Sequence, residues 1–94
     1  MRTVYCVIRR RVVVSGRVQG VFYRDTCRRT AVGEGVAGWV RNRPDGTVEA
    51  VFEGPPAAVE RLVAWTRRGP RDAVVDGVTV VAEEPRGESG FAVR

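Results

Sequence analysis

The spacing of apolar residues changes repeatedly along the chain between a strand pattern and a helix pattern, and this limits the possible folds most. Val12 and Val14 fall on one face of an extended segment, whereas Tyr23, Cys27 and Ala31 recur every four residues, as on one side of a helix. The predicted elements, in chain order, are a strand at about 7–17, a helix at about 23–33, strands at 35–42 and 47–54, a helix within 54–69, a strand at 76–84 and a short fifth segment at 90–94.

Turn residues and a second apolar stripe support this order. Pro44, Asp45 and Gly46 suit successive positions of a β-turn, so the strands on either side form a hairpin. Gly69 and Pro70 end the second helix. The residues of that helix expected to pack on the sheet are Ala58, Val59, Leu62, Val63, Trp65 and Thr66.

The order β, α, β, β, α, β with a terminal extension predicts an α+β protein of the ferredoxin-like sandwich type. Two helices then cover one face of an antiparallel sheet. A chain of 94 residues is long enough for one modest core and too short for two. We therefore expect residues 1–94 to form a single domain.

The absence of histidine and lysine excludes several classes of mechanism. All 16 basic residues are arginine. Without histidine there is no Ser/His/Asp or Cys/His catalysis and no histidine-ligated zinc, and without lysine there is no Schiff base and no Walker lysine. Any chemistry must use arginine, amide, carboxylate, hydroxyl or backbone groups.

The arginines give the chain a formal net charge of +5, which attracts anions. We interpret the arginine clusters at 9–11, 28–29 and 67–68 as solvated faces rather than nucleic-acid contacts. Cys6 and Cys27 have no metal-site spacing. We expect two reduced thiols partly buried in a core, with a disulfide or a reactive thiol as the alternatives.

Nothing in the sequence resembles a membrane span or a signal peptide. No stretch approaches the roughly 18 to 20 apolar residues that a span needs. Arginines at 9–11 interrupt the apolar start, and no small-residue cleavage site follows. We therefore expect a cytoplasmic protein with no membrane partner.

The segment SGRVQGVFYRD, residues 15–25, joins the first strand to the first helix. A glycine-rich loop that leads into a helix directs free backbone N–H groups at one point and binds an oxyanion there. Gly16 and Gly20 would permit the positive φ angles of such a loop. Arg24 would add a full charge and a planar fork for two phosphate oxygens.

The loop alone leaves alternatives open. Arg24 also fits a surface arginine of the helix. Asn42, just before the Pro-Asp-Gly turn, also fits a turn residue that hydrogen-bonds its own backbone. Arg17 is expected to face solvent, Gln19 to brace the loop, and Trp39 to serve packing rather than substrate stacking.

Two motifs together resemble the acylphosphatase family. The first, GxVQGVxxR, is met by Gly16, Val18, Gln19, Gly20, Val21 and Arg24. The second, GWVxNxxDGxVE, is met by Gly38, Trp39, Val40, Asn42, Asp45, Gly46, Val48 and Glu49. The GPP and GP around the second helix and the ending GESGFAVR extend the resemblance from about Val12 onward. One departure is Glu34, at a helix end where the family usually has an apolar residue.

The resemblance implies hydrolysis of acyl phosphates to a carboxylate and inorganic phosphate, without a metal or another cofactor. It implies that Arg24 binds the phosphoryl group, that Asn42 orients the attacking water, and that the substrate phosphate accepts the water's proton. The implied phosphate-binding loop is Gly16, Arg17, Val18, Gln19, Gly20 and Val21. We expect a monomer with small-molecule acyl phosphates as partners and no nucleic acid.

Two other functions fit the same fold. An RNA-binding module would need aromatic residues on the central strands, which here carry valine. A related domain that binds phosphates or carbamoyl phosphate inside a larger protein, without hydrolysing them, is the second. The short chain and the Arg24–Asn42 pair argue against it.

Overall fold

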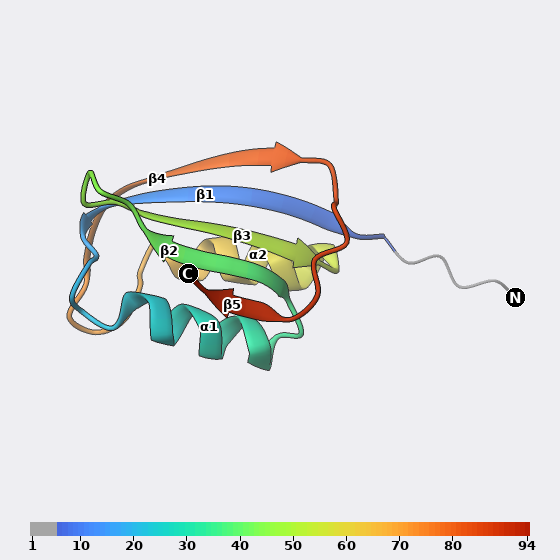
Figure 1. The fold of residues 1–94 in the computed structure, drawn as a ribbon, viewed down its shortest axis with the longest axis horizontal. Helices are drawn as coiled ribbons and strands as arrows, with labels where there is room; N and C mark the ends of the chain where they lie inside the picture. Colours follow the sequence, from blue (N-terminus) through green and yellow to red (C-terminus); the bar gives the residue numbers. More distant parts are fainter. Residues whose placement is uncertain (1–5) are drawn as a thin grey trace, which may run out of the picture.

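The computed structural model describes residues 6–94; residues 1–5 of the predicted single domain lie outside the described residues. Figure 1 shows two helices beside one twisted sheet. The elements are β1 (Ile8–Arg17), α1 (Tyr23–Gly33), β2 (Ala37–Asn42), β3 (Val48–Gly54), α2 (Pro56–Thr66), β4 (Val74–Glu83) and β5 (Phe91–Val93).

The sheet has five strands in the order β4-β1-β3-β2-β5. β1 pairs antiparallel with both β3 and β4, and β2 pairs antiparallel with β3. This is the predicted ferredoxin-like arrangement, and the fold class is confirmed. The terminal extension forms β5, which pairs with β2 in parallel. The sheet is therefore mixed rather than purely antiparallel.

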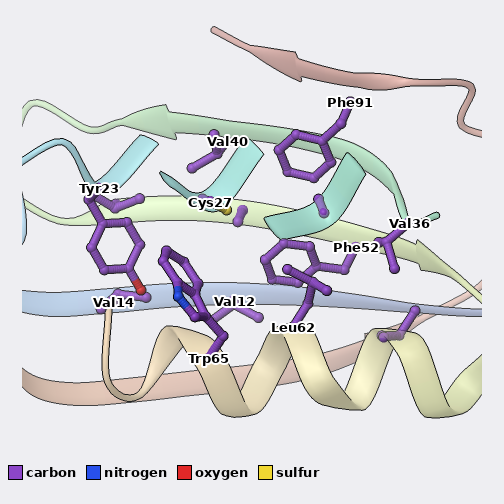
Figure 2. Packing of buried hydrophobic residues seen from close by; sticks show 14 of the residues in the cluster. Val12, Val14, Tyr23, Cys27, Val36, Val40, Phe52, Leu62, Trp65 and Phe91 are labelled. Carbon is purple, nitrogen blue, oxygen red and sulfur yellow. The ribbon is translucent and has the colours of Figure 1, made fainter. Parts of the chain in front are cut away.

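The core lies between the sheet and the two helices. Tyr23, Cys27 and Ala31 of α1 are buried, as the four-residue spacing predicts. The α2 stripe is confirmed as well, with Val63 half-buried against the core and the other five residues buried. Figure 2 shows Tyr23 and Trp65 side by side. Their ring centroids are 5.0 Å apart. This contact joins the start of α1 to the end of α2.

The opposite face of the sheet carries ion pairs, and this corrects one prediction. Arg9 is only 1% exposed, so it does not belong to a solvated face. Strand alternation directs Arg9 and Arg11 to the face that the helices leave uncovered. Their partners there are the carboxylates of Glu49, Glu53, Glu83 and Glu88. The arginines at 28–29 and 67–68 are exposed, as predicted.

Three further side chains bear on the predictions. Cys27 is buried and Cys6 is exposed, so the prediction of partial burial is wrong for Cys6, which precedes β1 and lies outside the sheet. Both cysteines are free. Glu34 lies at the C-terminal end of α1 and pairs with Arg61 of α2 at 2.9 Å, so a charge pair joins the helices at this position. No helix within residues 6–94 is long and apolar enough to cross a membrane.

Candidate active site

A cleft of about 540 Å³ opens where the β1–α1 loop, the end of β2 and the end of β5 meet. Figure 1 shows these three segments gathered at one end of the molecule, beside the start of α1. The lining residues are Val18, Gly20, Phe22, Tyr23, Arg24, Asp25, Asn42 and Val93. The fold therefore brings both predicted catalytic residues and part of the predicted loop to one cavity, whereas Gly16, Arg17, Gln19 and Val21 are not in its lining.

The loop backbone needs glycine at Gly16 and Gly20, as predicted. Gly16 has a φ of 121° and lies where the β1–β4 register shifts. A Cβ there would overlap the carbonyl oxygen of Val74. Gly20 has a φ of 73° and open space beside it, on the cleft side. The two glycines thus shape the turn that carries the chain from the sheet to α1.

Side chains of the loop anchor it on both sides. Val18 and Val21 are buried in the core. The Gln19 amide donates hydrogen bonds to the carbonyl oxygens of Arg43 at 2.8 Å and Thr47 at 2.9 Å. Gln19 therefore ties the loop to the β2–β3 turn, as the prediction of a loop brace requires. Arg17 is exposed at the end of β1, as expected.

Arg24 lies in the first turn of α1 and is half-buried in the cleft wall. Within residues 6–94 its guanidinium makes no side-chain hydrogen bond or ion pair. The neighbouring carboxylate of Asp25 pairs instead with Arg29 at 3.1 Å. No side chain caps the start of α1, so its first N–H groups have no capping acceptor. Positive charge and free donors are thus concentrated at this end of the cleft.

Asn42 is the last residue of β2 and faces the same cleft. Its Oδ1 is buried, and no group in the described part of the chain donates a hydrogen bond to it. In this turn it is Asp45 whose side chain hydrogen-bonds the backbone: its Oδ1 accepts a hydrogen bond from the Thr47 N–H at 3.0 Å. The alternative that Asn42 hydrogen-bonds its own backbone is therefore not observed. A buried amide oxygen is normally paired, so an unpaired one beside a cleft marks a candidate ligand group.

Tyr23 and Trp39 are both structural. The Tyr23 hydroxyl donates to the carbonyl oxygen of Thr66 at 2.7 Å, and burial raises the pKa of this phenol. Trp39 lies on the ion-paired face of the sheet and does not line the cleft. The guanidinium of Arg94 stacks over its indole at 4.6 Å from the ring centroid. The expectation that Trp39 serves packing agrees with this position.

Four lining residues were not among the predicted site residues: Phe22, Tyr23, Asp25 and Val93. Phe22 has a φ of 63°, and Val93 belongs to the edge strand β5. No sequence pattern predicts that a phenylalanine adopts a left-handed backbone conformation. Val93 reaches the cleft because β5 pairs in parallel with β2, and no local pattern predicts that pairing. In residues 6–94, no three Cys, Asp or Glu side chains are grouped as metal ligands.

Comparison with known proteins supports the sequence resemblance over nearly the whole chain. Residues 10–93 match the family model described as acylphosphatase. An acylphosphatase of Gloeobacter violaceus is 57% identical over 86 residues, which is 92% of each chain. An acylphosphatase of Rubrobacter xylanophilus is 60% identical over 86 residues, 89% of this chain and 77% of that protein. The structure of an acylphosphatase from Coxiella burnetii superposes with a TM-score of 0.90 at 36% identity, covering 94% of this chain and 93% of that one.

Proposed function

Since this chain belongs to the acylphosphatase family and is a hydrolase acting on acid anhydrides, we propose that its cleft hydrolyses the carboxyl–phosphate anhydride bond of acyl phosphates. Water attacks phosphorus, the P–O bond to the acyl group breaks, and the carboxylate leaves with the bonding electron pair. The products are a carboxylate and inorganic phosphate.

Arg24 and the loop amides hold the phosphoryl group. The guanidinium has no competing carboxylate within the described chain, and it lies in the helix turn whose N–H groups lack a capping acceptor. A planar fork binds two phosphate oxygens at once, and the backbone donors from the segment 16–21 neutralise the third. A loose phosphoryl transition state requires this charge stabilisation more than it requires covalent chemistry.

Asn42 orients the attacking water. An amide offers one acceptor and two donors, so it holds a water by its proton and contacts a phosphate oxygen with its N–H. Rotation of the amide plane by 180° exchanges its two ends, which lets the enclosed Oδ1 turn toward the cleft. The water's proton passes to a phosphate oxygen of the substrate. Holding the water in line with the P–O bond that breaks lowers the entropic part of the barrier.

No general acid is required in this mechanism. The leaving group is a carboxylate, which is a weak base and departs unprotonated. Tyr23 is among the residues that line the cleft, but its hydroxyl donates to the carbonyl oxygen of Thr66, and burial raises the pKa of the phenol, which opposes ionisation. The chain contains no histidine that could act instead.

One observation carries this proposal: Arg24 and the Asn42 amide oxygen, neither of which has a side-chain partner within residues 6–94, line one cavity at the start of a helix. Either group alone fits a structural role. Together they supply the two functions that hydrolysis of an anhydride needs: binding of the anion and orientation of water.

Asn42→Ala tests the role of water positioning. We expect kcat for benzoyl phosphate to fall by about 100-fold, the order found when one transition-state hydrogen bond is removed. Arg41→Ala is the matched control, because Arg41 precedes Asn42 on β2 and does not line the cleft. Activity of Asn42→Ala within threefold of the parent, with an unchanged circular dichroism spectrum, would exclude this role.

Arg24→Gln tests the phosphate site. We expect a loss of about 1,000-fold in kcat/KM, together with weaker competitive inhibition by inorganic phosphate. Arg28→Gln, at an exposed position of the same helix outside the cleft, should leave both unchanged. Inhibition of Arg24→Gln by phosphate at the parental concentration would rule out the assignment.

We further propose a cytoplasmic monomer without nucleic-acid partners. The ion pairs of Arg9 and Arg11 support only the last of these, the absence of nucleic-acid partners, because paired guanidinium groups are not available to a phosphate backbone. A phosphomonoester control in the same assay separates an acylphosphatase from a general phosphatase.

A further inference from the structure

Phe22 combines three properties that packing does not explain. Its φ of 63° lies in the left-handed region, which is sterically unfavourable for a residue with a bulky side chain. Its side chain is 79% exposed, so core burial does not stabilise the ring. The ring also borders the cleft beside Arg24. Strained residues of this kind concentrate at ligand sites.

Val93 approaches the same cleft from the other side. It pairs with Val40 in the parallel β2–β5 ladder, so it points to the same face of the sheet as Val40 and, two residues further along β2, Asn42. Val93 remains 43% exposed and lines the cleft. Phe22 and Val93 are therefore exposed apolar residues on two sides of the cleft that Arg24 and Asn42 also line; we name these two residues the apolar rim.

We propose that the apolar rim binds the acyl group of the substrate and selects acyl phosphates whose acyl group is aromatic or apolar. This inference rests on the proposed function. A phosphoryl group held by Arg24 and the loop amides leaves the acyl group to extend toward the cleft mouth, where the rim lies. Contact with an aromatic face stabilises a phenyl group more than a methyl or an amino group, because it removes more apolar area from water.

In this proposal the rim contacts the acyl group, whereas Arg24 and the loop amides contact the phosphate oxygens and Asn42 contacts the attacking water. Removal of the rim should therefore change the ranking of substrates and leave phosphate binding intact. Within residues 6–94 the other apolar lining residues, Val18 and Tyr23, are buried and offer little area to a ligand. Phe22 and Val93 supply most of the exposed apolar surface at the cleft.

Two variants and one control test the rim. Phe22→Asn removes the ring and keeps a residue type that tolerates positive φ. Val93→Ser removes apolar area and keeps the backbone pairing of β5. Val32→Ser is the control, because Val32 is an exposed apolar residue of α1 outside the cleft. The measurement is kcat/KM for benzoyl phosphate and for acetyl phosphate, with inhibition by inorganic phosphate.

We expect Phe22→Asn to lower kcat/KM for benzoyl phosphate by about fivefold relative to acetyl phosphate, as the loss of one aromatic contact predicts, and Val93→Ser by about twofold. Inhibition by inorganic phosphate should stay within twofold of the parent, and Val32→Ser should change neither ratio. Equal changes for both substrates in Phe22→Asn and Val93→Ser would overturn the acyl-binding role while leaving the proposed function in place. Turnover of neither substrate by the parent protein would instead overturn the proposed function.

Discussion

Replacing Arg9 by methionine should destabilise the protein far more than replacing an exposed arginine. Arg9 is 1% exposed, and its guanidinium contacts Glu88 at 2.8 Å, Glu83 at 2.9 Å and Glu53 at 3.2 Å. Burial opposes its charge, but the hydrogen bonds to these carboxylates outweigh the desolvation and raise its pKa. Arg9→Met keeps the apolar part of the side chain and removes the charged guanidinium, so the decrease in the free energy of unfolding measures the loss of the ion pairs.

The expected loss in the free energy of unfolding depends on the carboxylate that the substitution leaves without a cation. Glu53 is 4% exposed and would remain as a buried carboxylate without its cation. Removal of one partner of a buried pair costs about 3 to 5 kcal/mol. Glu53 would still accept hydrogen bonds from the backbone N–H groups of Arg86 at 2.8 Å and Glu88 at 2.7 Å, which places the expected loss at the lower end, about 3 kcal/mol. For a domain of this size the melting temperature should fall by at least about 10 °C.

The assay is urea unfolding at pH 7, followed by tryptophan fluorescence. The control is Arg29→Met, whose side chain is 77% exposed and pairs with Asp25 at i, i+4, and we expect it to lose less than about 0.5 kcal/mol. The double variant Arg9→Met/Glu53→Gln should recover about 1 kcal/mol relative to Arg9→Met, because the stranded charge is gone. A loss within 1 kcal/mol for Arg9→Met, or a double variant less stable than Arg9→Met, would refute this account.

Three other perturbations have expected outcomes. Hydrogen bonds from Arg11 and Arg9 lower the pKa of Glu83 to about 2, from 4.5, so its contribution to stability is complete above about pH 5 and disappears as the pH falls toward 2. Glu83→Gln should therefore lower the urea midpoint at pH 7 more than at pH 3. Gly38→Ala would place a Cβ against the carbonyl oxygen of Val51 at a φ of 139°, and the melting curve should show a loss of at least about 2 kcal/mol. Tyr23→Phe leaves the buried Thr66 carbonyl without its hydrogen bond, so unfolding in urea should show a loss of about 1 to 2 kcal/mol.

Local patterns were sufficient for most of the fold and for the identity of the candidate site. The period of apolar residues depends only on the geometry of each element, so the bounds of α1 at Tyr23–Gly33 agree with the sequence prediction. The positive φ angles of Gly16 and Gly20 follow from the absence of a side chain. Asn42 is different, because the residues around it left a turn residue and a site residue as alternatives, and the first motif, GxVQGVxxR, was needed to favour the site.

Tertiary structure decided the features that depend on residues distant in the chain. The burial of Arg9 requires carboxylates 44 to 79 positions away, and no local pattern distinguishes it from a solvated arginine. The place of Val93 at the cleft requires the parallel pairing of β5 with β2. The left-handed conformation of Phe22 is set by the loop around it rather than by its own preference. The sequence by itself thus determined which elements form and which groups are available for chemistry, because periodicity and backbone freedom are local. Only the folded chain decided which surface surrounds those groups, because pairing and burial join segments that are far apart.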